Sequence, residues 1–334
     1  AMLGLILASM FVVGLRTTLD ADDFLTWGWR LPFLFSIVLL LVALWIRLQL
    51  NESPVFQRMK EHGATSKAPL KEAFGKWKNL KIVLIALFGA VAGQAVIGFS
   101  GHLYPLFFLE KIAKVDGATA NFLVATALTI TIPLYVFWGW LSDKIGRKPI
   151  MMSACVIAVF AYFPLYSALV SAANPAMAAA IERAPVRIVA HGAECSFQFD
   201  PIGSNTFDKT SCDIVKSYLA KSGINYENIE APMGSIASVR IGNRNIIAPD
   251  PALLSDDTKA TAVTAFGSDV QRELVAAGYP TDADPDKIDR FKVIVILCML
   301  GTLGTMVYGP LAALLVELFP ARIRYSSLSL PYHI

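Results

Sequence analysis

One short segment places a carboxylate, three basic side chains and two glycines within ten residues. It reads Gly139-Trp140-Leu141-Ser142-Asp143-Lys144-Ile145-Gly146-Arg147-Lys148. The aspartate can lie near a helix N-terminus, where negative charge is stabilised by about 0.3–1 kcal/mol. The first glycine allows two helices to approach closely, and the second allows a tight turn. These properties fit an ion-pair gate formed by Gly139, Asp143, Lys144, Gly146, Arg147 and Lys148, with an ordinary basic loop as the alternative.

Glu317 is the second acid expected in this gate. Like Asp143 it stands at the end of a long apolar segment, and no carboxylate lies deep within such a segment. Its expected basic partners are Arg147 and Arg322, and the sequence leaves the choice between them open.

A further set of polar side chains lies inside the apolar segments. Such groups are costly in a bilayer unless they are paired, so they usually face a helix bundle or a water-filled path. Gln94 is the first candidate for hydrogen bonding, because it lies mid-segment between two glycines, Gly93 and Gly98. An interhelical hydrogen bond is the alternative for Gln94. The other candidates are Ser100, Tyr104, Asn121, Thr302 and Tyr308.

His102 is the titratable member of this set. An unperturbed histidine changes charge near neutral pH, which suits a group that carries protons. The alternative is a structural histidine or one at the level of the lipid headgroups. Nearby threonines are expected to bond to the backbone of their own helix; these are Thr126, Thr129 and Thr131.

The composition explains why these residues must act within a membrane. Of the 334 residues, 55% are hydrophobic and only 16% are charged, and the mean hydropathy is +0.54. These values argue against a soluble enzyme or a disordered chain, and a net charge of +3 is too small to indicate a nucleic-acid partner. A span needs about 20 apolar residues. Six spans and the start of a seventh are predicted, at 1–15, 31–50, 82–109, 119–141, 150–172, 291–316 and 326–334.

Residues 173–290 interrupt the apolar pattern. They hold 11 Lys/Arg and 16 Asp/Glu, a net charge of −5, whereas the remainder carries +8. We therefore predict three parts: spans in 1–172, a soluble insert in 173–290, and a span with the start of another in 291–334. The fold class is an all-α membrane protein with a small α+β insert. In the insert, we expect two short strands in 186–199, a helix at 211–220, a hairpin at 239–247 and a helix at 255–277.

The loop charges predict the orientation in the membrane. Basic residues mark cytoplasmic loops, and they gather in 51–81, 142–149 and 317–325. Counting spans then puts the insert on the periplasmic side. That compartment permits disulfides, so we predict a Cys195–Cys212 bond, with two free thiols as the alternative. Cys155 and Cys298 lie within spans and are expected to be buried hydrophobic residues.

No metal or cofactor site is predicted. Asp282, Asp284 and Asp286 imitate the start of a calcium loop, but Lys287 and Val293 stand where that loop needs glycine and glutamate. His191, Cys195 and Asp200 fit no catalytic motif, and no enzyme activity is expected.

The ten-residue segment 139–148 resembles the signature loop of the major facilitator superfamily. Three other segments look like its metabolite–proton symporter family: 27–33 (WGWRLPF), 52–54 (ESP) and 317–326 (ELFPARIRYS). The resemblance covers 1–172 and 291–334. It implies two six-helix halves that rock around a central site, and it aligns this chain with family helices five to ten and the start of eleven. The resemblance therefore implies an incomplete transporter.

The resemblance also implies roles for the candidates. The six polar residues Gln94, Ser100, Tyr104, Asn121, Thr302 and Tyr308 would bind the substrate. His102 would couple protons, unless the coupling acid lies in helices one to four. The expected partners are a small solute such as an organic acid or osmolyte, protons and the lipid bilayer, in a multi-pass protein of the bacterial inner membrane that is monomeric when complete. The alternatives are an exporter of the same fold, or a sensor whose insert binds a ligand.

Overall fold

The computed structural model describes residues 2–49, 54–63, 66, 68–200 and 205–333. It divides into two compact units. The helical unit comprises Ala1–Leu106, Gly117–Tyr166 and Ile294–Ile334, and the insert unit comprises Phe107–Asp116 and Ser167–Val293. Of the segment 52–54, Glu52 and Ser53 lie outside the described residues.

Within the described part of the chain, five helices are long and apolar enough to cross a membrane: Gly28–Gln49, Trp77–Ile112, Gly117–Ile145, Arg147–Ala173 and Arg290–Leu318. They coincide with five of the predicted spans. The sixth predicted span, 1–15, lies in α1 (Met2–Thr18), which is not among these five helices. The start of a seventh falls in α15 (Arg324–His333). The count of six spans plus one therefore stays a prediction.

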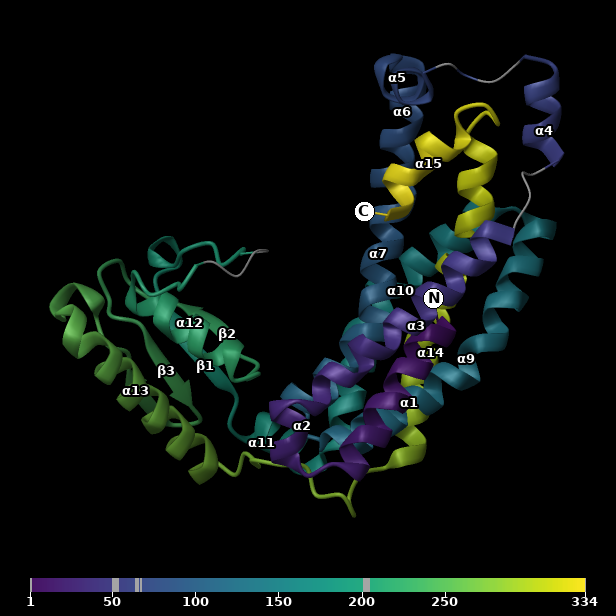
Figure 1. Ribbon diagram of the computed structural model, residues 1–334. Helices are drawn as coiled ribbons and strands as arrows, with labels where there is room; N and C mark the ends of the chain where they lie inside the picture. The colour runs from purple at the N-terminus through teal and green to yellow at the C-terminus, as the bar shows by residue number, and fades with distance from the viewer. Residues whose placement is uncertain (1, 50–53, 64–65, 67, 201–204, 334) are drawn as a thin grey trace. The chain divides into compact units, whose positions relative to one another are not determined.

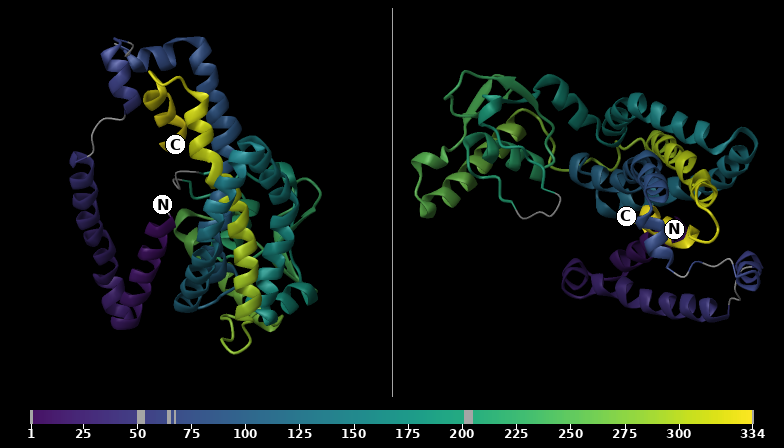
Figure 2. Two further views of the ribbon diagram at one scale, coloured as in Figure 1. Left: turned by 90° about the vertical axis from the view of Figure 1, so that its right-hand side faces the viewer. Right: turned by 90° about the horizontal axis from the view of Figure 1, so that it is seen from above.

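The first helices form a hairpin, which Figure 2 shows as the two purple arms of a V. The first arm is α1, and α2 (Ala21–Thr26) and η1 (Gly28–Arg30) make the turn into α3 (Leu31–Gln49). The rings of Phe11 and Phe35 stack at 5.3 Å between the arms. α3 buries none of its side chains, which is the state expected of a helix that faces lipid or further protein. Two short helices follow, α4 (Pro54–Glu61) and α5 (Pro69–Gly75).

The span Trp77–Ile112 alternates between α-helical and π-helical turns. Its pieces are α6 (Trp77–Ile85), η2 (Ala86–Val91), α7 (Ala92–Gly98), η3 (Phe99–Leu103), α8 (Tyr104–Phe107) and η4 (Phe108–Ile112), where η2, η3 and η4 are π-helical. Such turns are rare and are frequently found at functional sites. This span forms the core of the helical unit with α10 (Arg147–Ala173) and α14 (Arg290–Leu318), where Val83, Ala154 and Leu315 are completely buried. The remaining span is α9 (Gly117–Ile145).

The insert unit contains a four-stranded sheet with the order β2-β1-β3-β4. The strands are β1 (Val186–Ala190), β2 (Glu227–Glu230), β3 (Ser238–Ile241) and β4 (Arg244–Ile247). β1 is parallel to β2 and antiparallel to β3, and β3 is antiparallel to β4. The helical elements are α11 (Pro175–Arg183), η5 (Gly192–Glu194), α12 (Ser211–Lys221), η6 (Pro251–Leu253) and α13 (Asp256–Ala276), with α12 and α13 alongside the strands in Figure 1.

One face of this sheet forms the hydrophobic core of the insert. Alternation along β1 buries Val186 and Ile188 on the same side. Val215 of α12 and Val270 of α13 are fully buried against that face. The predicted helices at 211–220 and 255–277 and the hairpin at 239–247 are thus confirmed, and Gly242 makes the hairpin turn with φ +54°.

The prediction of two strands in 186–199 is wrong for the second of them. After Ala190 the chain forms η5 and then a loop. The backbone N–H of Ser196 donates to the Asp213 carboxylate at 2.8 Å, and so does its hydroxyl, also at 2.8 Å. These bonds take the place of a strand ladder. β1 pairs instead with β3 on one side and with β2 on the other, and the β2 sequence Glu-Asn-Ile-Glu carries little strand signal.

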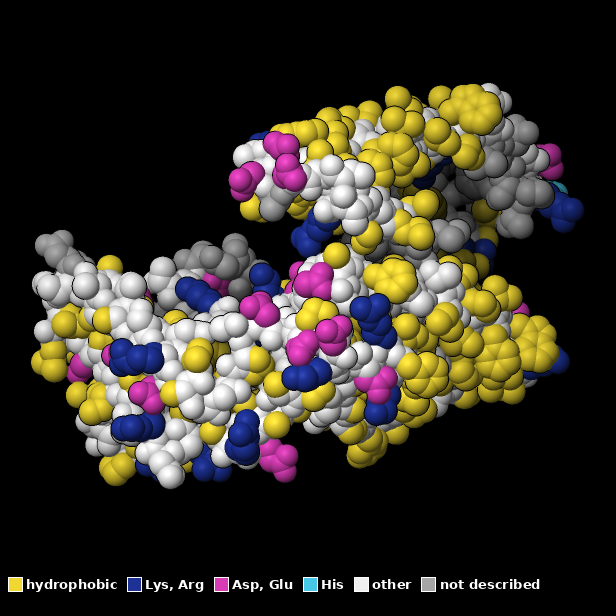
Figure 3. Space-filling view, turned by 90° about the horizontal axis from the view of Figure 1, so that it is seen from below, with side chains coloured by type: hydrophobic (Ala, Val, Ile, Leu, Met, Phe, Trp, Pro, Cys, Tyr) yellow, Lys and Arg dark blue, Asp and Glu magenta, His cyan; other side chains and the backbone are white. Residues whose placement is uncertain are grey.

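Cys195 and Cys212 form a disulfide that links this loop to α12, and they are the pair chosen from the sequence. Cys155 and Cys298 are free and partly buried. Figure 3 shows the contrast between the two surfaces. Hydrophobic side chains cover the spans, whereas charged side chains of both signs are interspersed on the insert. We take the multi-pass membrane character of the protein from this surface together with the spans.

Candidate functional site

His102 lies at the centre of a buried polar cluster in the helical unit. Its side chain belongs to η3 and is 3% exposed. Nδ1 lies 3.2 Å from the carbonyl oxygen of Gly98, and Nε2 lies 3.2 Å from the hydroxyl of Tyr135 on α9. The ring of Tyr308 on α14 meets the imidazole edge to face at 6.1 Å. Three spans thus contribute one ring each to the cluster.

The two hydrogen bonds indicate the tautomer of His102 when its ring is neutral. A carbonyl oxygen only accepts, so Nδ1 must carry the proton that it donates to Gly98. In neutral His102, Nε2 then accepts from the Tyr135 hydroxyl. A second proton on the ring would turn Nε2 into a donor, and the hydroxyl of Tyr135 would have to rotate to accept it. Gain or loss of one proton therefore changes the direction of a hydrogen bond between two spans.

Glycines make room for these rings. A Cβ atom at Gly304 of α14 would overlap the His102 imidazole, and one at Gly98 would overlap the ring of Tyr308. At Gly301, a Cβ would lie 3.2 Å from the side chain of Thr131. The small residues therefore let α14 approach the span that carries His102.

Tyr135 was not among the candidates selected from the sequence, although it faces His102. The contact joins two spans, and no pattern in the sequence shows which face of α9 meets His102, so nothing in the sequence singled out Tyr135.

The other polar candidates lie in different surroundings. Gln94 is 6% exposed, and its side-chain amide makes no hydrogen bond to a described residue. The ring of Tyr104 packs on Tyr166 at 5.5 Å, and the Tyr166 hydroxyl donates to the carbonyl of Ser100. Thr302 donates to the Cys298 carbonyl of its own helix at 2.7 Å.

Asn121 also bonds within its own helix, where Nδ2 donates to the carbonyl of Gly117 at 2.7 Å. The expectation that the threonines bond to their own backbone holds for Thr126, Thr129 and Thr131. The structure therefore brings Tyr308 to His102 but places Asn121 at the far end of α9, in its first turn.

Arg147 holds two carboxylates at the opposite end of α9. Its Nη2 lies 2.9 Å from Asp143 Oδ1 and 2.9 Å from Glu317 Oε1, and its Nη1 donates to the Ser142 carbonyl at 3.2 Å. The arginine side chain is 19% exposed, whereas the two acids are largely exposed. This arrangement joins α9, α10 and α14, and it gives Glu317 the first of its two expected partners.

The remaining gate candidates surround that cluster. Gly146 adopts φ +95° in the turn from α9 to α10, which only glycine adopts without strain. A Cβ at Gly309 would lie 3.2 Å from the backbone nitrogen of Gly139, so α9 and α14 are close there. The Lys144 ammonium lies 4.0 Å from the Trp140 ring centroid, and Lys148 is exposed.

Arg322 pairs with Glu72 of α5 and not with Glu317. A hydrogen bond from Ser66, and then the charge of Arg322, lower the pKa of Glu72 from its ordinary value, while burial opposes them. No sequence pattern indicated this partner, because Glu72 lies in a predominantly basic loop far from Arg322 along the chain.

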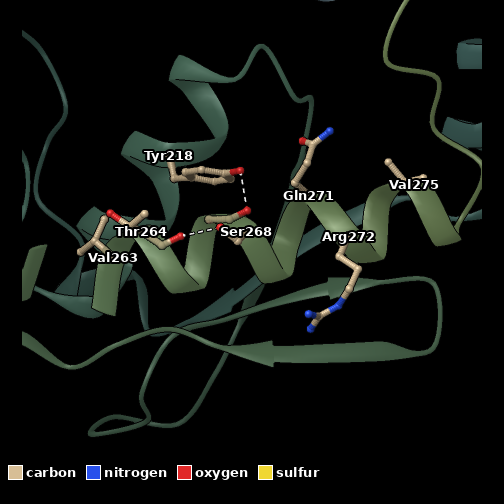
Figure 4. Close-up of a pocket in the computed structure, with 8 residues that line it drawn as sticks. Tyr218, Val263, Thr264, Ser268, Gln271, Arg272 and Val275 are labelled. Carbon is tan, nitrogen blue, oxygen red and sulfur yellow. Dashed lines mark hydrogen bonds between the residues drawn. The ribbon is translucent and has the colours of Figure 1, made fainter. Parts of the chain in front are cut away.

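The insert carries a shallow depression of about 800 Å³ beside α13 (Figure 4). The Tyr218 hydroxyl donates to the Gly267 carbonyl at 2.7 Å, Ser268 donates to the Thr264 carbonyl, and Arg272 pairs with Asp269. Because these polar groups already have partners, we assign no ligand to the depression. No group of three metal-ligating side chains occurs among the described residues.

Apolar spans, a buried polar cluster and a charged helix turn define a multi-pass helical membrane protein. The family model of the Major Facilitator Superfamily matches residues 1–187, more than half of the sequence. The chain belongs to the Major Facilitator Superfamily.

Curated relatives are similar over about half of this chain. The alpha-ketoglutarate permease of Escherichia coli (strain K12) is 30% identical over 174 residues, 52% of this chain and 38% of the permease. The shikimate transporter of the same strain is 31% identical over 172 residues, 50% of this chain and 38% of the transporter. A putative proline/betaine transporter of Staphylococcus haemolyticus (strain JCSC1435) is 30% identical over 152 residues, 45% and 31% of the two chains. The chain thus spans less than two-fifths of each relative, and no solved structure matches it.

Proposed function

We propose that this chain works as part of a secondary transporter that moves a small metabolite across the bacterial inner membrane by alternating access. The observation that carries the proposal is the buried pair of His102 and Tyr135 in the core of a Major Facilitator Superfamily chain. The relatives, an alpha-ketoglutarate permease, a shikimate transporter and a putative proline/betaine transporter, support an organic acid or osmolyte as the solute.

Proton symport is the proposed form of coupling. His102 exchanges donor and acceptor roles with Tyr135 when it gains a proton, and these residues lie on different spans. A change of one proton would therefore alter how the two spans are held together. Gln94, whose amide bonds to no described residue, would contact the solute together with Ser100, Tyr104, Thr302 and Tyr308. Asn121 is the weakest of the six, because its amide is bonded within its own first turn.

The proposed orientation follows the loop charges. The basic segments 51–81, 142–149 and 317–325 would be cytoplasmic, which places the Arg147 cluster at the cytoplasmic end of the spans. The insert would be periplasmic, where its disulfide can form and persist. We propose the part boundaries 1–172, 173–290 and 291–334 on the same grounds.

Uptake by the full-length protein tests the proposal. We expect proteoliposomes with an inward proton gradient to accumulate a labelled dicarboxylate or betaine, and a protonophore to abolish the accumulation. His102→Gln should lose accumulation but keep exchange of solute against solute, because exchange needs no net proton movement. If His102→Gln accumulates solute normally, the coupling group is not His102. If no gradient drives uptake, the symport proposal fails.

Glu317→Gln should loosen the gate in the full-length transporter. The change removes one of the two carboxylates that Arg147 bridges, at an exposed site where ion pairs contribute up to about 1 kcal/mol. We expect an about two- to fivefold shift in the balance of inward- and outward-facing states. The rate of cysteine labelling in the substrate path measures that balance. The control is Glu182→Gln, an exposed acid of α11, and unchanged labelling in Glu317→Gln would contradict the role.

A further inference from the structure

The turn that follows the span Trp77–Ile112 is held by residues that come much later in the chain. Ala113 is fully buried, and its carbonyl accepts a hydrogen bond from Nδ2 of Asn174 at 3.0 Å. The backbone N–H of Ala283 donates to the carbonyl of Lys114 at 2.8 Å. The ammonium of Lys114 donates to the carbonyl of Ser222 at 3.1 Å. All of these residues belong to the insert unit.

The backbone of Lys114 is in a conformation that side chains disfavour. Its φ is +58°, in the left-handed region where a residue other than glycine costs about 1–2 kcal/mol. Such a conformation persists only where its surroundings enforce it. Burial, followed by the charge of Lys111, lowers the pKa of the Lys114 side chain. The contacts from Ser222 and Ala283 are the surroundings that hold this turn.

Gly223 brings a second backbone against the same turn. It ends α12 with φ +69°, and the N–H of Ile224 donates back to the carbonyl of Leu219, as in a Schellman motif. A Cβ at Gly223 would lie 2.7 Å from the carbonyl oxygen of Lys111. The end of α12 therefore packs directly on the last π-helical turn of the span, η4.

We propose that the insert is a clamp on the end of the span Trp77–Ile112, and that it controls how far this end of the helix moves. We call Asn174, Ser222, Gly223 and Ala283 the clamp. They contact residues 111–114 through hydrogen bonds and close backbone packing. The effect on transport rests on the proposed function, but the clamp itself does not. The π-helical turns η2 and η3, between the clamp and α6, are where this helix would yield when its clamped end stays fixed.

Hydrogen exchange of the full chain in nanodiscs tests the clamp. Gly223→Ala inserts a methyl group against Lys111, so the amides of Ala113, Val115 and Ala283 should exchange about tenfold faster, which corresponds to about 1.4 kcal/mol. The matched control is Gly278→Ala. Gly278 occupies the same position after α13 with φ +90°, but its nearest neighbour is the flexible end of Arg183 at 3.2 Å. Both variants place an alanine at a position with positive φ, so both carry the same conformational strain. Only Gly223→Ala brings the new methyl group against the backbone of Lys111.

A second variant protects the test against misfolding. Lys114→Met keeps the stem of the side chain but removes the bond to Ser222, and it should accelerate exchange at the same three amides about threefold. Unchanged protection in β1 and β3 shows that the insert is still folded. If neither variant accelerates exchange at 113–115 while the strands stay protected, the clamp is refuted. In the full-length transporter, Gly223→Ala should also change the uptake rate, and Gly278→Ala should not. If the wild type and every variant fail to take up solute, the transport proposal is contradicted. The exchange result would still decide whether the clamp exists.

Discussion

Gly304→Ala is expected to destabilise the helical unit and to abolish proton-driven uptake by the full-length protein. The new Cβ would overlap the imidazole of His102, which is buried and bonded on both sides. Overpacking of this kind costs about 1–3 kcal/mol. Because the ring must leave its place between Gly98 and Tyr135, its hydrogen bond to the Tyr135 hydroxyl is lost as well. This is the bond whose direction depends on the protonation of His102. Thermal unfolding and gradient-driven uptake measure the two effects.

Two comparisons make this prediction specific to the cluster. Gly93→Ala is the control, since its Cβ would lie at an ordinary 3.5 Å from Cys155, and it should stay near wild type. The double variant His102→Ala with Gly304→Ala should recover part of the stability, because the missing imidazole leaves space for the new methyl group. Its uptake should still be uncoupled. Equal destabilisation of the single and double variants would show that the overlap with His102 is not the cause.

Five of the spans and the turn between α9 and α10 were predictable because their signals are local. Long apolar runs give the spans, and the ten residues from Gly139 to Lys148 give a turn at Gly146 whatever else the chain contains. The hairpin around Gly242 and the helix end at Gly223 are also local, since each needs one residue with positive φ. The choice of Cys195 and Cys212 followed from compartment and spacing alone.

Features that depend on distant contacts were not predictable. β2 is a strand because it pairs with β1, some 40 residues earlier in the register Arg187 to Glu227, and its own sequence is polar. Glu72 meets Arg322 across 250 residues. Tyr135 needed knowledge of which face of α9 meets His102. In each case the deciding interaction is between elements whose relative placement no sequence pattern encodes.

The ion pairs of the proposed gate show the same limit. The sequence supplied the acid Glu317 and two basic candidates at the correct end of the spans. It could not choose between Arg147 and Arg322, because both follow helix ends. The structure separates them: Arg147 bridges α9, α10 and α14, and Arg322 joins the loop before α15 to α5. This end of the spans therefore contains two ion-pair contacts in place of the one expected.

Removing the disulfide should destabilise the insert more than any single surface change. The bond closes a loop of sequence separation 17, for which the chain-entropy estimate is about 3 kcal/mol. Cys212 is 2% exposed within the core, so alanine is the appropriate replacement at both positions. The same loop delivers Ser196 to Asp213, a carboxylate with 0% exposure. Without the disulfide, the loop would open more often. The Asp213 carboxylate would then lose the two hydrogen bonds that it accepts from Ser196.

Hydrogen exchange measures the loss in the full chain. In the variant Cys195→Ala with Cys212→Ala, amides of β1 and α12 should exchange on the order of 100-fold faster, which corresponds to about 3 kcal/mol. The control is Cys155→Ala with Cys298→Ala, which removes the free thiols of the spans and should leave β1 and α12 unchanged. Adding reductant to that control should reproduce the exchange of the first variant, because only the disulfide remains to be reduced. If the exchange rates change by less than about threefold in both experiments, the core of Val186, Val215 and Val270 holds the insert together without the disulfide. The chain-entropy contribution would then be cancelled by structure that persists in the unfolded insert.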